Sequence, residues 1–265
     1  MQKVKFNIWL GAYWRYQRWI SQNTYRRRAI LRTSVPVISF TFDDFPRSAL
    51  QVGGPILRRH NIRSTYYASL GLMNREAPVG TIFSQGDLSA LIADGHELGC
   101  HTYAHSHAWN TPPREFEESI CDNQRALRDL LPNTHFRTMS YPISEPRPRN
   151  KRLAAKRFAC CRGGGQTFNA GVVDRNYLRA FFLEKSKENV NAVKEVIECN
   201  ARARGWLIFA THDVCDHPTR FGCTPGFFED VVRCASVSGA RILPVGEAWD
   251  FIQGNESVAQ SRSST

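Results

Sequence analysis

Two adjacent carboxylates end a strongly apolar stretch near the start of the chain. Asp43 and Asp44 follow "VPVISFTF", residues 35–42, a pattern that predicts a buried strand. Burying two negative charges side by side is costly unless each one has a partner. One alternative is that a carboxylate caps a helix or turn, since Phe45 and Pro46 follow. The pair otherwise predicts cationic or hydrogen-bonding partners close by.

Two histidines, His101 and His105 in "HTYAH", are the first candidate partners. On a helix this spacing places both imidazoles on one face, where they could share a metal ion. The alternative is a pair of unrelated histidines at the surface or the core edge. With one aspartate they would form a two-histidine, one-carboxylate set that leaves positions open for water and substrate. We therefore predict a metal site here.

Adjacent carboxylates suit such a site because neighbouring residues of a strand point in opposite directions. Near the end of the strand, one aspartate can turn towards the metal while the other faces the bound water. A metal lowers the pKa of that water to about 7, and the free carboxylate can accept its proton. The chemistry expected from this arrangement is metal-assisted hydrolysis.

The elements that must position these residues alternate between short apolar runs and helical patterns. We predict strands over residues 35–42, 63–71, 136–142, 205–213 and 241–246. We predict helices over residues 48–61, 87–95 (with Asp87 as N-cap and Gly95 at the end), 113–132, 148–159, 190–205 and 224–240. This alternation predicts a mostly parallel sheet, and six or so units fit a closed β/α barrel.

Three polar clusters fall at or near predicted strand ends, where parallel folds collect their active sites. They are Asp43-Asp44, the His101–His105 segment, and Thr211-His212-Asp213. An imidazole at the third position suits proton transfer because its pKa lies near neutrality.

The motifs "TFDD", "HTYAH", "SYP" and "FATHD", in this order, resemble those of the polysaccharide deacetylases. They are most similar to the nodulation-type chitooligosaccharide deacetylases of carbohydrate esterase family four, over roughly residues 35–250. The resemblance implies an α/β fold, a distorted (β/α) barrel of the seven-stranded type in a single domain. It also implies a divalent metal, usually Zn²⁺ but alternatively Co²⁺, Mn²⁺ or Ni²⁺, and hydrolysis of an N-acetyl or other acyl group on a sugar.

The resemblance also implies a role for each matching residue. Asp43 would be the general base, His212 the general acid, and Asp213 a residue that orients His212. The metal ligands would be Asp44, His101 and His105. Tyr141, Pro142 and Ile143 would line the substrate site, with the backbone N–H of Ile143 stabilising the oxyanion. Trp109 would either stack on a sugar ring or pack in the core.

One position departs from the family pattern. Ser140 stands where the third motif usually has an arginine that holds the catalytic aspartate. Arg162 in "CCRGGGQ", if it lies at the next strand end, could supply the missing charge, or it could be a surface residue beside a glycine-rich turn. The departure leaves open an alternative function, a catalytically weak or inactive barrel that binds sugar or acts as a scaffold.

The N-terminal segment carries most of the chain's excess positive charge. The 265 residues have a formal net charge of +11, and residues 1–42 contain eight Lys and Arg but no Asp or Glu. Aromatic and apolar residues of this segment recur near helical spacing. A helix packed on the barrel with a solvated basic face, contact with an anionic membrane, and the least favoured option, nucleic-acid binding, all remain open. We divide the chain into this segment (1–32), the barrel (33–254) and a disordered tail (255–265).

The compartment is predicted from two features. The sequence shows no secretory signal and no run long enough to span a membrane. Its eight cysteines contain no C-x-x-C pair, so we expect free thiols in a reducing compartment. We therefore predict a cytoplasmic protein, in contact with the inner membrane face if residues 1–32 bind lipid. The expected substrate is an N-acetylated oligosaccharide or a lipid- or nucleotide-linked sugar that serves as a precursor of an envelope glycan.

Overall fold

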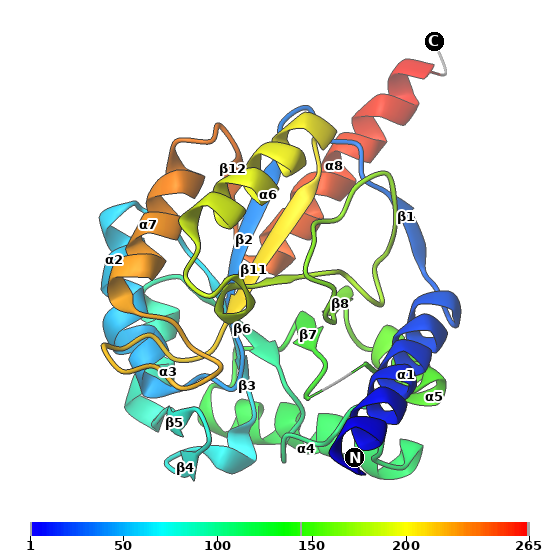
Figure 1. Ribbon diagram of the computed structural model, residues 1–265. Coiled ribbons are helices and arrows are strands. Elements are labelled where there is room, and N and C mark those ends of the chain that lie inside the picture. Colours follow the sequence, from blue (N-terminus) through cyan, green and yellow to red (C-terminus); the bar gives the residue numbers. More distant parts are fainter. Residues whose placement is uncertain (1, 144, 264–265) are drawn as a thin grey trace.

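A curved parallel sheet forms the centre of the molecule (Figure 1). The computed structural model describes residues 2–143 and 145–263. Seven strands of this sheet follow the order β10-β11-β2-β3-β6-β7-β8. Their bounds are β2 (Val37–Phe42), β3 (Thr65–Ala68), β6 (Glu97–Cys100), β7 (Thr138–Ser140), β8 (Cys160–Arg162), β10 (Phe181–Phe182) and β11 (Trp206–Thr211).

The strand order makes this sheet a distorted barrel. From β2 to β8, consecutive strands of this sheet (β2, β3, β6, β7 and β8) lie side by side. Strand β11 then pairs in parallel with β2 on its other side. Strand β8 bonds to the segment that leads into β10: Gly163 N–H donates to Leu178 O (2.9 Å), and Cys161 N–H donates to Arg175 O (2.8 Å). The (β/α) barrel of the seven-stranded type is therefore confirmed.

Helices and short strand pairs surround the barrel (Figure 1). The helices are α1 (Gln2–Asn23), α2 (Gly54–Arg59), α3 (Gln85–Ala93), α4 (Pro113–Leu130), α5 (Pro148–Ala155), α6 (Val190–Ala203), α7 (Pro225–Ser236) and α8 (Val245–Ser263), with a π-helical turn η1 (Ala49–Gly53) and 3₁₀ turns η2 (Leu70–Leu72) and η3 (Leu183–Ser186). The remaining strands are β1 (Arg28–Ile30), antiparallel to β9 (Val172–Asp174); β4 (Glu76–Ala77), antiparallel to β5 (Gly80–Thr81); and β12 (Arg241–Ile242), parallel to β2.

The central strands are apolar because both of their faces are covered. Every residue of β2 and β11 is buried, which explains the continuous apolar runs in the sequence. Between the sheet and the surrounding helices, Phe40 and Phe209 stack with ring centroids 5.4 Å apart, and Phe228 of α7 meets Phe40 edge-on at 5.9 Å. The core therefore fixes the carboxyl ends of β2 and β11 against each other.

Several predicted element ends differ from the structure. The N-cap of α3 is Ser84, whose hydroxyl accepts from the backbone of Asp87, while Asp87 is the third residue of a capping box. Gly95 follows the helix with a φ of +74°, as predicted. Strand β10 was missed because it contains only two residues. Helix α8 continues to Ser263, so residues 255–263 are helical, whereas the sequence analysis expected a disordered tail.

All eight cysteines are free, as expected. Among the described residues, no helix combines the length and the apolar character needed to cross a bilayer.

Helix α1 is fixed to the barrel by a buried lysine. The ammonium of Lys151, whose side chain is fully buried, binds the carboxylate of Asp174 and the backbone carbonyl oxygens of Ser21 and Thr24 (2.8 Å for Thr24). Because these carbonyls lie at the carboxyl end of α1, the positive charge also interacts favourably with the negative end of the helix dipole. The N-terminal helix is thus anchored to the same core as the barrel.

Substituting Lys151→Met is expected to lower the free energy of unfolding by about 3–5 kcal/mol, because it leaves a buried carboxylate without its cation. Urea unfolding measures this loss. Lys156→Met, at an exposed lysine just after α5, is the matched control and should cost little. Equal losses in the two variants would contradict the role assigned to Lys151.

A second prediction concerns pH and the buried His96. Its Nδ1 accepts a hydrogen bond from the backbone N–H of Ser64 (3.0 Å), so the folded protein holds this imidazole neutral. Burial lowers the pKa of His96 to about 4. Because the unfolded chain binds this proton near pH 6.5, stability from this group is complete above pH 6.5 and is lost as the pH falls towards 4.

We expect His96→Gln to reduce the loss of stability between about pH 7 and pH 5 by about 2 kcal/mol, as judged by urea unfolding at both values. His135→Gln, at an exposed histidine, is the control and should leave the pH dependence unchanged. A wild-type dependence retained in His96→Gln would refute the assignment.

Candidate metal centre and active site

The two aspartates leave β2 through an unusual turn. The backbone N–H of Asp43 continues the sheet by donating to Thr211 O of β11 (2.9 Å). Asp44 and Phe45 then adopt left-handed conformations, with φ of +61° and +52°. Such conformations are uncommon for residues with a side chain and are found at functional sites. The turn sends the neighbouring carboxylates to different partners.

One of these carboxylates faces both histidines. Oδ1 of Asp44 lies 3.2 Å from Nε2 of His101 and 3.0 Å from Nε2 of His105. Potential ligand atoms of the three side chains all lie within 4.8 Å of one another. His101 is buried, whereas His105 and Asp44 are partly accessible. The structure thus brings together the three residues expected to bind a metal.

The histidines meet in a loop and not on a helix, so the helical interpretation of their spacing is wrong. Strand β6 ends at Cys100, and Thr102 and His105 have φ of +60° and +51°. The hydroxyl of Thr102 accepts from the backbone N–H of Ser106 (2.7 Å) and closes the loop. The tight turn, rather than one turn of helix, places the two imidazoles 5.1 Å apart.

The donor set fits a divalent cation. Nδ1 of His101 lies 2.8 Å from the carbonyl oxygen of Ser140, so it must carry the hydrogen, and in the neutral ring Nε2 keeps its lone pair. That lone pair faces Oδ1 of Asp44, a buried oxygen with no hydrogen-bond partner of its own. Facing lone pairs of this kind are stabilised by a cation between them.

The other carboxylate is held by Arg162. Nη2 of this arginine donates to Oδ1 of Asp43 and to the hydroxyl oxygen of Ser140. Asp43 and Arg162 are both buried. Burial would raise the pKa of Asp43, but Arg162, His101 and His212 lower it below its usual value. Asp43 therefore stays ionised, as a proton acceptor must.

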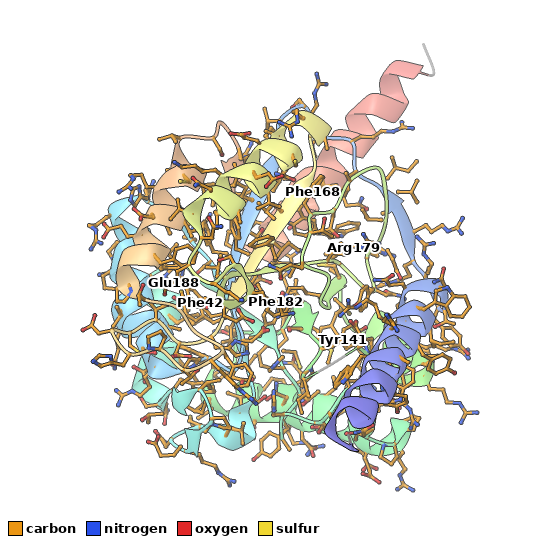
Figure 2. All side chains as sticks on the ribbon, in the orientation of Figure 1. Phe42, Tyr141, Phe168, Arg179, Phe182 and Glu188 are labelled. Atoms are coloured by element: carbon orange, nitrogen blue, oxygen red, sulfur yellow. The ribbon has the colours of Figure 1, made fainter. Side chains whose placement is uncertain are left out.

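Aromatic rings fix the position of the Arg162 guanidinium. It lies over Tyr67 and Phe182, with its central carbon 5.3 Å and 5.4 Å from the ring centroids, and Nη1 donates to Gly163 O (3.1 Å). Phe182 is the last residue of β10, and Phe42 is the last residue of β2; both are labelled in Figure 2. Arg162 is therefore a buried residue of the site and not a surface residue at a turn.

His212 and Asp213 follow β11 but do not bond to each other. Nδ1 of His212 lies 3.2 Å from Phe221 O, so it carries the hydrogen and Nε2 is the atom left to exchange a proton. Asp213 instead accepts from the N–H and hydroxyl of Thr219, at 2.7 Å and 2.6 Å. Asp213 therefore makes no direct bond to His212; it shapes the loop that carries Phe221, the partner of His212.

The expected substrate-binding residues separate into two groups. Tyr141 is buried and donates to Asn176 O (3.1 Å), and Trp109 packs edge-on against Tyr13 and Tyr16 of α1, at 6.5 Å and 6.3 Å. Neither ring is a free platform for a sugar. Ile143 has a φ of +68° and a largely exposed side chain, and it directly follows Pro142. The loop of Pro142 and Ile143 remains the candidate to contact substrate.

Glu184 of η3 is a charged residue near the site that sequence reasoning missed. Its Oε2 is buried and has no hydrogen-bond partner. Burial raises the pKa of Glu184 to about 7, with Lys185 and Arg162 opposing the rise and Asp43 adding to it. The apolar run before it, residues 180–183, could have indicated another strand end facing the site.

Comparison with known proteins agrees with this geometry. The sequence model of the polysaccharide deacetylase family matches residues 31–159. A search of the curated proteins finds no match. The matched segment contains Asp43, Asp44, His101 and His105, and it ends just before β8, so Arg162 and His212 lie beyond it.

Solved structures extend the fold similarity to most of the chain. The chitin deacetylase of Colletotrichum lindemuthianum matches with a TM-score of 0.59 at 18% identity, covering 82% of this chain and 89% of that one. A family 4 acetyl xylan esterase from Clostridium thermocellum, in complex with cobalt, gives 0.57 at 18%, covering 81% and 90%. A Bacillus anthracis pseudoenzyme of carbohydrate esterase family four gives 0.59 at 10%, covering 83% and 67%.

The barrel, the aspartate pair at the end of β2 and the matched segment all lead to one assignment. Residues 31–159 of this chain match the polysaccharide deacetylase family, and the chain has the fold of the chitin deacetylase and the family 4 acetyl xylan esterase.

Proposed function

We propose that this protein is a metal-dependent hydrolase that removes an N-acetyl group, or a related acyl group, from a sugar. The observation that carries the proposal is that the two neighbouring carboxylates have different partners. Asp44 faces two imidazoles, and Asp43 faces a guanidinium. A carboxylate beside two imidazoles suits a metal site, and an ionised carboxylate beside that site suits a general base. The match of residues 31–159 to the polysaccharide deacetylase family supports deacetylation as the reaction.

Asp44, His101 and His105 would hold the metal, which when bound supplies Lewis-acid activation of water and of the acyl oxygen. Two imidazoles and a carboxylate suit Zn²⁺, and Co²⁺, Mn²⁺ or Ni²⁺ are alternatives. Asp43 accepts a proton from the attacking water. Protonated His212 donates from Nε2 to the departing amine, and the backbone N–H of Ile143 is the candidate donor to the oxyanion.

A catalytically inactive barrel that binds sugar is the competing function, and one of the structural neighbours with this fold is a pseudoenzyme. Ser140 in place of an arginine favoured that alternative in the sequence. The contact between Arg162 and Asp43 weakens it, because the base has a cation partner from the adjacent strand. We therefore favour an active enzyme.

The proposal is tested by measuring acetate release by protein loaded with Zn²⁺ or Co²⁺. Free N-acetylated oligosaccharides, nucleotide-linked sugars and lipid-linked sugars are compared, together with an O-acetylated xylan. Release from at least one N-acetylated substrate, abolished by chelator and restored by metal, is expected. Sugar binding without any release would support the inactive barrel instead. This comparison of carriers tests the predicted precursor substrate; the cytoplasmic location stays a separate prediction.

A further inference from the structure

Helix α1 presents aromatic rings to solvent while it is fixed to the barrel. Gln17 and Ser21 are buried against the barrel, and the Ser21 hydroxyl donates to Pro146 O. Arg18 Nε donates to Glu145 at 2.9 Å. With the buried contacts of Lys151, these bonds hold the orientation of the helix. The direction in which its outer face points is therefore set by the fold.

The outer face combines indole and phenol rings with arginine. The side chain of Trp19 is 61% exposed and that of Tyr16 is 55% exposed, and Arg15 is also exposed. These three residues fall within one side of the helix at 100° per residue. Rings with a polar tip, beside cationic side chains, are typical of helices that lie in the interface of a membrane.

The positive charge of residues 1–42 is complementary to an anionic surface. Residues 1–42 contain eight basic and no acidic residues, and Arg26 and Arg28, which follow α1, are exposed. An anionic lipid surface attracts such a cluster. A second copy of the same helix would bring like charges together, which disfavours a dimer through this face.

We propose that α1 docks this protein on an anionic membrane, with Trp19, Tyr16 and Arg15 at the level of the lipid head groups. Helix α1 lies beside α5 and the loop after β7 (Figure 1), and Trp109, four residues after His105, packs on Tyr13 and Tyr16. The docked helix therefore adjoins the rim of the catalytic site. If the proposed function holds, on which this consequence rests, the substrate is an acylated sugar held at the membrane surface.

The experiment is co-sedimentation of the full chain with vesicles of phosphatidylcholine, with and without phosphatidylglycerol. We expect binding to the anionic vesicles that weakens at high salt. The double variant Trp19→Ser, Arg15→Glu should bind at least about tenfold more weakly, because it loses an interfacial ring and reverses a charge. The matched control is Lys194→Glu, Val237→Ser, which makes the same kinds of change at exposed residues of α6 and at the end of α7.

Absence of binding, or equal binding of the two double variants, would overturn the proposal. The same would follow if the full chain bound duplex DNA or RNA as tightly as vesicles, or formed a dimer that Trp19→Ser, Arg15→Glu disrupts. Hydrolysis of a soluble acylated sugar should not differ between the two double variants. Vesicle binding without hydrolysis of any substrate would leave the docking in place and refute the proposed function.

Discussion

Asp43→Asn is expected to retain the metal and lose the reaction, whereas Asp44→Asn is expected to lose both. The asparagine at position 43 keeps the shape of the side chain but cannot accept a proton, so we expect turnover to fall by about 10²–10⁴. Asp44 faces the two imidazoles, and without its charge the site loses one of three ligands. Metal content after dialysis and the rate of acetate release are measured for each variant.

Asp216→Asn is the matched control for these two variants. Asp216 is exposed in the loop after β11, and its amide should change neither metal content nor turnover. Thermal unfolding shows whether each variant is folded. If Asp43→Asn removed the metal as completely as Asp44→Asn, both carboxylates would be ligands and the base would have to be another group. Normal turnover in Asp43→Asn would exclude it as the base.

Arg162→Met is expected to retain the metal and to reduce turnover by at least about 10², because Asp43 loses the cation that keeps it ionised. The guanidinium lowers the pKa of Asp43, so its removal should raise that pKa. The acidic limb of the pH profile of kcat/KM should therefore move to higher pH. The free energy of unfolding should fall by about 3–5 kcal/mol, because a buried carboxylate is left unpaired.

Exchanging the two residues provides a sharper test of Arg162. Ser140 of β7 and Arg162 of β8 are partners in the parallel register, and their side chains touch. The double variant Ser140→Arg, Arg162→Ser moves the cation by one strand, to the position where the family usually has it. We expect it to recover part of the lost turnover and to return the acidic limb towards lower pH. Near-normal turnover in Arg162→Met would refute the role.

The sequence alone determined the β/α class of the barrel and which residues meet at the candidate metal site. Continuous apolar runs such as residues 37–42 and 206–211 report burial on both faces, which is a local property of the pattern. Polar residues directly after such runs collect at one end of a parallel barrel whatever the details of packing. Asp43, Asp44 and His212 could therefore be placed without coordinates.

The tertiary structure decided what the local pattern could not. Arg162 and Ser140 are 22 residues apart in sequence, and only the register of β7 with β8 brings them together at Asp43. The histidine spacing was correctly singled out, but left-handed residues replace the expected helix because a loop must turn both imidazoles to Asp44. Asp213 bonds to Thr219 instead of His212, and α1 is anchored by a lysine 130 residues away from Ser21. Such contacts depend on which distant segments pack together, and the local sequence pattern does not determine this packing.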